Sequence, residues 1–198
     1  MTDLTVQRVR GAFRHYRPRS IPGASLLKQA AVAAILREGA DGRGAEFLLI
    51  RRAEHPQDPW SGHMAFPGGR RDETDADSLA AAIRETQEEV GLDLQRHADR
   101  IGRLSHLMAR AQGRPLPMVI VPYLFHLAPD APVELQPSSE VAEIVWVPLA
   151  FLANPANRES FAYRVGGLSM PLPCIFFGGR KIWGLTLRMI DELLGAVR

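Results

Sequence analysis

The sequence lacks the features that mark several protein classes. It has one cysteine, Cys174, in 198 residues, so no disulfide can form within the chain. Its 24 Lys and Arg against 22 Asp and Glu leave a formal net charge of +2, too small to indicate binding of nucleic acid or of an anionic membrane. No apolar run approaches the roughly 20 residues of a membrane helix, and the N-terminus shows no signal-peptide pattern. These absences favour a cytoplasmic location and argue against nucleic-acid or membrane partners.

The rest of the composition is ordinary for a globular protein. Hydrophobic residues make up 46% and charged residues 23% of the chain, whose length suits one well-buried domain and is short for two. We therefore expect a single domain over residues 1–198. Within it, residues 1–25 are predicted to form an N-terminal helix and a connector, because apolar residues recur at helical spacing in 4–13 and Pro18 and Pro22 follow.

Hydrophobic patterning predicts many strands and few helices. Strands are expected at 30–36 (whose alanines would suit a helix equally), 46–52, 101–109, 118–126, 143–147, 161–165 and 170–176. Helices are expected at 4–13, 148–153 and 181–197, in addition to the one described next. Pro117 and Pro122 predict that their strand lies at a sheet edge or carries a bulge. The pattern indicates an α/β domain with a mixed β-sheet packed between helices.

The most informative stretch runs from residue 66 to residue 92. A Pro-Gly-Gly turn and an acidic loop lead into a helix that we expect to begin after Asp75 or Asp77 and to end at Gly91. On this helix three carboxylates fall within an arc of about 100°, and apolar residues occupy another arc. The three are Glu85, Glu88 and Glu89.

Carboxylates crowded near a helix C-terminus repel one another and the helix dipole, and Arg84 offsets only part of this repulsion. A divalent cation would relieve the rest, and oxygen ligands suit Mg²⁺ or Mn²⁺. A solvated acidic face is the alternative. The glycine-rich turn favours a site, because Gly68 and Gly69 let the backbone approach a ligand closely.

The stretch resembles the Nudix box: Gly, five residues, Glu, seven residues, then Arg-Glu-apolar-any-Glu-Glu-any-Gly-apolar. The matching residues are Gly69, Arg84, Glu85, Glu88, Glu89, Gly91 and Leu92, so the box spans residues 69–92. Thr86 takes a slot that is usually apolar, and Gly69 and Arg84 lie one residue further apart than the general pattern. This longer spacing is similar to that of the coenzyme A pyrophosphatase subgroup, whose acidic positions here are Asp72, Asp75 and Asp77.

The resemblance implies a Nudix-type α/β/α sandwich and a hydrolase that cuts the diphosphate of a nucleoside-diphosphate-linked compound. It implies that the three box glutamates hold Mg²⁺ or Mn²⁺, that the carbonyl of Gly69 or Gly68 adds a ligand, and that Arg84 braces a neighbouring carboxylate. These residues would form the catalytic set. The general base stays open between Glu89 and Glu85, and Glu140 in a loop outside the box is a further candidate, with Glu143 behind it. For Glu140 and Glu143 a surface carboxylate is the alternative.

An upstream pattern also resembles the coenzyme A subgroup. Its matching residues are Leu48, Leu49, Arg52, Gly62, Met64, Ala65, Phe66, Pro67, Gly68 and Gly69. Ile50 replaces a Thr, and residues 58–61 lack the usual basic residue. Coenzyme A or acyl-coenzyme A is thus the expected small-molecule substrate, with ADP-ribose, NADH or a nucleoside triphosphate as alternatives, and a non-catalytic binding module as another. Expected substrate contacts are Arg52, Arg70, Gly68 and Phe66. A homodimer stays open.

Overall fold

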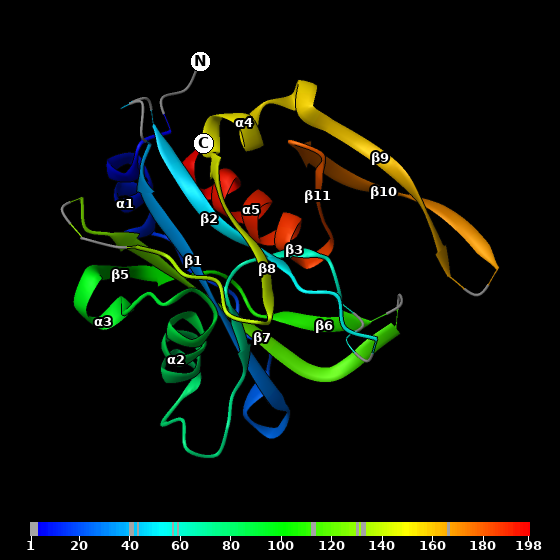
Figure 1. Ribbon diagram of the computed structural model, residues 1–198, viewed down its shortest axis with the longest axis horizontal. Helices are drawn as coiled ribbons and strands as arrows, with labels where there is room; N and C mark the ends of the chain where they lie inside the picture. Colours follow the sequence, from blue (N-terminus) through cyan, green and yellow to red (C-terminus); the bar gives the residue numbers. More distant parts are fainter. Residues whose placement is uncertain are drawn as a thin grey trace.

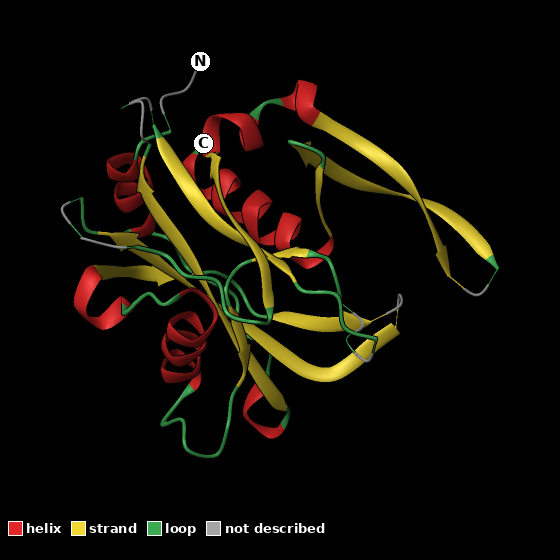
Figure 2. Cartoon of the chain, viewed as in Figure 1, coloured by secondary structure: helices red, strands yellow, loops and turns green. Residues whose placement is uncertain are grey.

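A twisted mixed sheet forms the centre of the molecule in the computed structural model (Figures 1 and 2), which describes residues 4–39, 42, 44–56, 58, 60–111, 114–129, 131, 134–165 and 167–198. Across these residues eight strands join, with the order β3-β2-β1-β7-β5, and β4, β6 and β8 pair with β1, β7 and β2. Their bounds are β1 Lys28–Glu38, β2 Ala45–Arg52, β3 Met64–Ala65, β4 Gly68–Arg70, β5 Ala98–Arg103, β6 Leu107–Ala111, β7 Arg114–Leu127 and β8 Val141–Pro148.

Helices cover both faces of this sheet, which confirms the predicted α/β/α arrangement. Their bounds are α1 Val6–Phe13, α2 Ser78–Val90, α3 Leu94–His97, α4 Leu149–Ala153 and α5 Gly184–Val197, with short 3₁₀ turns at Ala24–Leu26 and Pro155–Asn157. Along β1, Ala34 and Leu36 pack into the cluster that contains α1 and α5, whereas Ala33 and Ile35 pack into the cluster that contains the end of α2. Because successive side chains of a strand point to opposite faces, β1 is buried on both.

The position of the second long strand corrects one prediction. β7 is central, since it pairs in parallel with β1 on one side and antiparallel with β5 and β6 on the other, so the edge placement inferred from its prolines was wrong. The alternative, a bulge, is confirmed by register shifts in both antiparallel pairings. Pro122 lies opposite the break between β5 and β6, because Tyr123 pairs with Arg103 and Ile120 with Leu107. A missing N–H is tolerated where the partner strand is interrupted.

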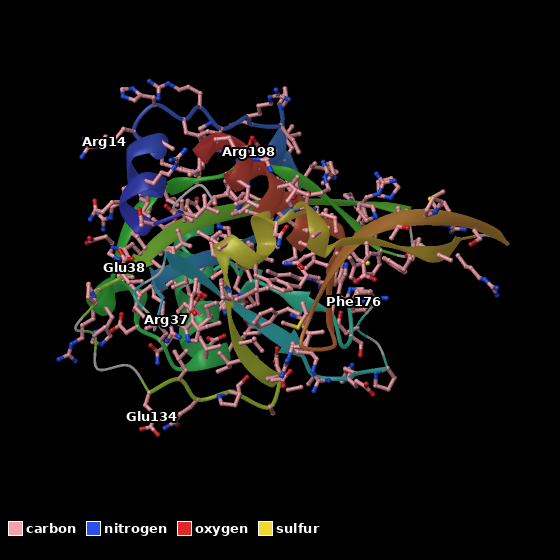
Figure 3. All side chains as sticks on the ribbon, turned by 90° about the horizontal axis from the view of Figure 1, so that it is seen from above. Arg14, Arg37, Glu38, Glu134, Phe176 and Arg198 are labelled. Carbon is pink, nitrogen blue, oxygen red and sulfur yellow. The ribbon has the colours of Figure 1, made fainter. Side chains whose placement is uncertain are left out.

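A second, antiparallel sheet of three strands consists of β9 Arg158–Val165, β10 Leu168–Phe177 and β11 Arg180–Trp183, in the order β11-β10-β9. β9 and β10 pair antiparallel as a hairpin, in whose connection Gly166 lies outside the described residues. In Figure 3 this hairpin projects from one side of the molecule, with Phe176 labelled near its base, while Arg14 at the end of α1 lies on the other side. Cys174, the single cysteine, is fully buried.

The last helix begins later than expected. Residues 181–183 belong to β11, and α5 starts at Gly184, whose φ of 64° breaks the strand. The other predicted strands and helices are confirmed, with the segment 101–109 split into β5 and β6. β1 and β2 pair antiparallel, with Glu38 opposite Ala45 at the end nearest their connection. None of the described helices combines the length and the hydropathy needed to span a bilayer.

Candidate functional site

The Pro-Gly-Gly turn ties the acidic helix to the sheet. β4 pairs with β1, and Gly68 adopts φ 145°, so a Cβ there would lie 2.2 Å from the carbonyl oxygen of Ala31. A Cβ at Gly69 would lie 2.4 Å from Cδ of Glu85. Gly68 therefore requires glycine, for its backbone conformation and its close contact with β1, whereas a side chain at residue 69 would displace the Glu85 carboxylate.

Local capping fixes the ends of α2. Asp77 is the N-cap, since its Oδ1 accepts a hydrogen bond of 2.8 Å from the N–H of Ala80. Gly91 ends the helix with φ 72°, as expected. The loop before β8 completes this end, because the N–H groups of Gln136 and Ser138 donate to the carbonyls of Val90 and Glu89 at 3.1 and 2.9 Å. Carbonyls that a helix leaves unpaired thus bind a segment far along the chain.

Glu89 is buried, so the alternative of a solvated acidic face does not hold for this residue. It is 3% exposed, and its Oε2 accepts a hydrogen bond of 2.7 Å from the N–H of Gly68. Its Oε1 lies 3.7 Å from Nη1 of Arg52. Burial raises the pKa of Glu89 to about 7, against the opposing effects of the Gly68 hydrogen bond and the Arg52 charge.

Arg84 connects the acidic side chains around it. Its Nε and Nη2 bind Asp75 at 3.1 and 2.9 Å, and its Nη1 donates to Glu85 at 3.0 Å and Glu88 at 2.9 Å. Nη2 also donates to the carbonyl oxygen of Arg70 at 3.1 Å. The hydrogen bonds from Arg84 lower the pKa of the nearly buried Asp75. Sequence reasoning offered Asp75 as a possible N-cap and missed this pairing.

Glu85 and Glu140 approach the same region from separate elements. Burial raises the pKa of Glu85, and the charges of Glu88 and Glu140 raise it further. The charge of Glu140 also raises the pKa of Glu89, which places Glu140 near both box carboxylates. Its backbone is fixed by a 3.2 Å hydrogen bond to Oγ of Ser138 and by a 2.8 Å bond from the N–H of Ala53. The structure therefore brings the loop candidate to the box.

The other site residues predicted from the sequence differ in how close they lie to the box glutamates. Arg52 lies beside Glu89 and is held by Asp58 at 2.8 Å. Arg70 is exposed next to the turn. Phe66 is 1% exposed and packs edge-on against Phe47, so a stacking role on a substrate base does not fit and the ring belongs to the core. Glu143 lies apart, in an ion pair of 2.5 Å with Arg180.

The donor set of the box fits a hard divalent cation in its chemistry. Glu85 and Glu89 both lie against the glycine turn, and the side chain of Glu88 is 58% exposed and can turn from Arg84. Within the described ranges no three His, Cys, Asp or Glu side chains already converge as ligands. Glu85 and Glu88 both accept hydrogen bonds from Nη1 of Arg84. Carboxylate oxygens are the ligands that Mg²⁺ and Mn²⁺ prefer.

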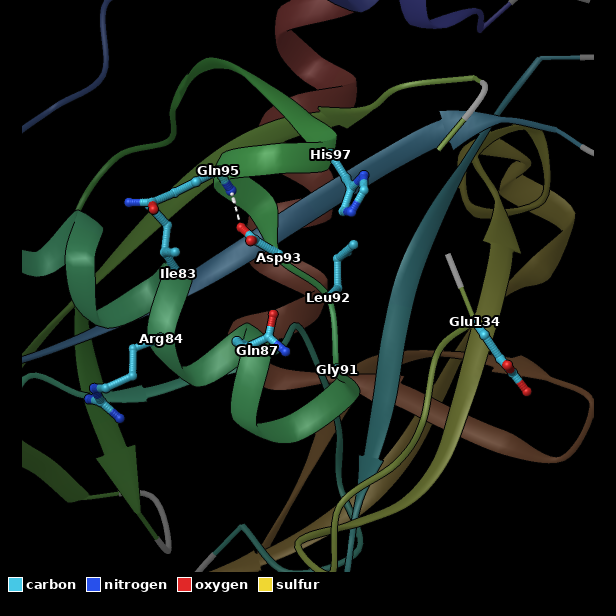
Figure 4. A pocket seen from close by; sticks show the side chains of 9 residues that line it. All are labelled: Ile83, Arg84, Gln87, Gly91, Leu92, Asp93, Gln95, His97 and Glu134. Carbon is cyan, nitrogen blue, oxygen red and sulfur yellow. Dashed lines mark hydrogen bonds between the residues drawn. The ribbon is translucent and has the colours of Figure 1, made fainter. Parts of the chain in front are cut away.

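A cavity of about 530 Å³ flanks α2 but contains none of the three box glutamates. Figure 4 shows Ile83, Arg84 and Gln87 along its helical wall, with Asp93 accepting a hydrogen bond from the N–H of Gln95 nearby. Of the residues that bond to the box glutamates, Arg84 lines it, together with Gly91 and Leu92 at the end of the helix. We therefore assign the chemistry to the turn side of α2.

Comparison with known proteins decides the family. The model of the NUDIX domain matches residues 27–165, which include the turn, α2 and the Glu140 loop. The chain belongs to the Nudix hydrolase family. The matched residues include the segment from Gly69 to Leu92 that resembles the Nudix box, with Glu85, Glu88 and Glu89.

Relatives of this Nudix hydrolase include proteins named for coenzyme A. It is 33% identical over 168 residues to human "Mitochondrial coenzyme A diphosphatase NUDT8", covering 82% of this chain and 68% of the human protein. It is 39% identical over 109 residues to an uncharacterized protein of Schizosaccharomyces pombe, but spans only 33% of that protein's length. Among solved structures, a C. elegans Ap4A hydrolase binary complex matches with a TM-score of 0.51 and 28% identity, covering 63% of this chain and 82% of that one.

Proposed function

We propose that this Nudix hydrolase cleaves the diphosphate of coenzyme A or an acyl-coenzyme A, giving 3′,5′-ADP and phosphopantetheine or its acyl form. The observation that carries the proposal is the buried Glu89 carboxylate, bonded to Gly68 and adjacent to Glu85 and Arg52. The name of the human relative supports coenzyme A as the substrate, as does the upstream pattern from Leu48 to Gly69.

The box residues would hold the divalent cation in this proposal. Glu85, Glu88 and Glu89 supply carboxylate oxygens, and the Gly69 carbonyl is a further candidate ligand. When bound, Mg²⁺ or Mn²⁺ neutralises charge on the diphosphate oxygens. Arg84 holds Glu85 and Glu88 in place, and Asp75 holds Arg84 in turn. Such support from a second layer of residues orients ligand side chains.

Proton transfer from the attacking water needs a base within reach of the box. Glu140 is exposed, and none of the ion pairs found in the described part of the chain involves it. Glu85 and Glu89 are nearby alternatives, and Glu143 is disfavoured because Arg180 and Arg51 already bind it. Arg52 and Arg70 flank the turn and can bind phosphate oxygens. The bond that breaks is a phosphorus–oxygen bond of the diphosphate, and water supplies the new oxygen.

Product identification tests the proposal. Purified protein with MgCl₂ or MnCl₂ is incubated separately with coenzyme A, acetyl-coenzyme A, ADP-ribose, NADH, Ap4A and ATP, and products are identified by mass spectrometry. We expect 3′,5′-ADP and phosphopantetheine from coenzyme A. Much faster turnover of ADP-ribose or NADH would overturn the substrate assignment, and no turnover of any compound would favour a binding module. A cytoplasmic location stays a prediction, because the human relative is named as mitochondrial.

A further inference from the structure

A second cavity, of about 550 Å³, lies where the end of the large sheet meets the small sheet. Arg51, Glu143, Arg180, Lys181, His63 and Trp183 are among the residues that line it. They come from β2, β8, β11 and the segment before β3. Three permanent cations face one carboxylate here, so the cavity is positively charged overall. The function assigned to the box does not use this charge.

The cations are held in place. Arg180 binds Glu143 through Nε at 2.7 Å and Nη2 at 2.5 Å, and Arg51 shares Glu143 at 3.4 Å. The third nitrogen of Arg180 donates to the carbonyl of Gly178 at 3.1 Å, in a turn where a Cβ at Gly178 would lie 2.7 Å from Nη1. The glycine thus makes room for the guanidinium. Glu143 keeps two guanidinium groups side by side, which is an arrangement suited to phosphate.

Aromatic side chains and Lys181 form another part of the wall. The Trp183 ring lies 4.9 Å from the ring of His63 and 5.0 Å from that of Phe161. Nζ of Lys181 lies 3.9 Å from the centre of the Phe161 ring, and no salt bridge among the described residues includes it. An indole beside phosphate-binding cations can stack on a nucleobase.

This cavity adjoins the box through two consecutive residues. Arg51 lines the cavity, and the next residue, Arg52, approaches Glu89 to 3.7 Å. The pairing of β2 with β8 shifts register between these two residues, at the end of β2. The N–H of Arg52 also donates to the carbonyl of His63 at 3.0 Å, which joins the cavity wall to the strand end. A ligand that passes around the end of β2 can therefore reach both sites.

We propose that this cavity binds the 3′-phosphorylated nucleoside end of the substrate, with the phosphate at Arg51, Arg180 and Lys181 and the base against Trp183. This inference rests on the proposed function and deepens it. Coenzyme A carries a phosphate outside its diphosphate, whereas ADP-ribose and NADH do not. A second cationic site therefore discriminates in favour of coenzyme A over dephospho-coenzyme A.

Binding of the non-hydrolysable product fragment tests this site separately from catalysis. Isothermal titration compares 3′,5′-ADP with 5′-AMP, which lacks the 3′-phosphate. We expect wild-type protein to bind 3′,5′-ADP about tenfold more tightly. Arg180→Gln and Lys181→Gln should each remove most of that preference. Arg14→Gln, which makes the same charge change at an exposed residue on the other side of Figure 3, should retain it.

Thermal unfolding of each variant verifies the fold, and Lys181→Gln provides the test if loss of the Glu143 pair destabilises the Arg180 variant. Equal wild-type affinity for the two nucleotides, or an unchanged preference in folded Lys181→Gln, would overturn the proposal. Retained preference without coenzyme A hydrolysis would overturn the proposed function and leave the site. Hydrolysis of coenzyme A and dephospho-coenzyme A with equal KM would overturn the phosphate site and leave the proposed function.

Discussion

Glu85 occupies the space that a side chain at residue 69 would fill, since a Cβ on Gly69 would lie 2.4 Å from the Glu85 Cδ and 2.5 Å from both carboxylate oxygens. Because Gly69 belongs to β4, which pairs with β1, the backbone cannot yield easily. The carboxylate must therefore move if residue 69 gains a methyl group. This contact couples the turn of the box to its helix.

Gly69→Ala should reduce kcat by at least about tenfold while the protein stays folded, because displacement of Glu85 disturbs the catalytic geometry. Steady-state kinetics with circular dichroism measures both effects. Gly195→Ala is the matched control, since that helical glycine is exposed and a Cβ there meets no atom within 4 Å. Wild-type kcat in Gly69→Ala would show that the Glu85 position is unimportant for turnover.

Removing single box charges should abolish most activity. Glu88→Gln and Glu89→Gln should each lose roughly 100-fold or more in kcat, because the amide is a weaker cation ligand than the carboxylate and carries no charge. Kinetics and Mn²⁺ titration by calorimetry measure turnover and metal affinity. Glu38→Gln, at the exposed end of β1, should change neither. Normal turnover in either box variant would contradict the metal-site assignment.

Arg84→Lys should lower both stability and activity. A lysine has no planar fork and cannot bind Asp75 through two nitrogens while contacting Glu85 and Glu88. Asp75 is 6% exposed, so a weakened partner leaves a nearly buried carboxylate poorly paired. We expect a loss of about 1–3 kcal/mol in the free energy of unfolding, measured in urea. Arg188→Lys, at an exposed residue of α5, is the control. An Arg84→Lys variant as stable as wild type would contradict the proposed role of Arg84.

The metal-free protein should lose stability as pH rises. The pKa of Glu89 is raised from 4.5 to about 7 in the fold, so the native state binds this proton more tightly than the unfolded chain. The stability from this proton is complete below pH 4.5 and is lost as pH rises through about 7, with a loss of about 3 kcal/mol. Burial raises the Glu85 pKa too, so its effect has the same sign.

Urea unfolding in EDTA at several pH values between about 5 and 8 measures this loss. Glu89→Gln should flatten the profile, because the amide does not titrate. Added Mg²⁺ should restore stability at the higher pH values. A wild-type profile that is flat or rises with pH would contradict the burial of an ionisable Glu89.

Much of the site could be predicted from sequence because its rules are local. Gly91 ends α2 and one of the two candidate caps, Asp77, begins it, since both follow from spacing along a helix. The prediction that the three glutamates share one face of the helix was only partly right, because Glu89 turns toward the buried N–H of Gly68. That hydrogen bond depends on where β4 packs, which no helical periodicity encodes.

Long-range pairing explains the remaining differences. The prolines of β7 suggested an edge strand, but tertiary packing placed it between β1 and β5 and accommodated Pro122 at the break before β6. β3 and β4 have 2 and 3 residues, too few to show a period. Asp75 was considered as a helix cap, whereas it pairs with Arg84, nine residues further along the chain. That pairing depends on the conformation of the loop between them, which the sequence pattern does not give.

The hydrogen bonds from Gln136 and Ser138 to the last carbonyls of α2 mean that the Nudix motif is not autonomous. A peptide truncated after Leu92 would carry every signature residue, yet its helix terminus would be exposed to solvent and Glu140 would be missing. Insertions between residues 138 and 140 would likewise separate Glu140 from the carboxylates of the box. The constraint on this family member thus extends beyond its signature, to a loop more than forty residues further along the chain.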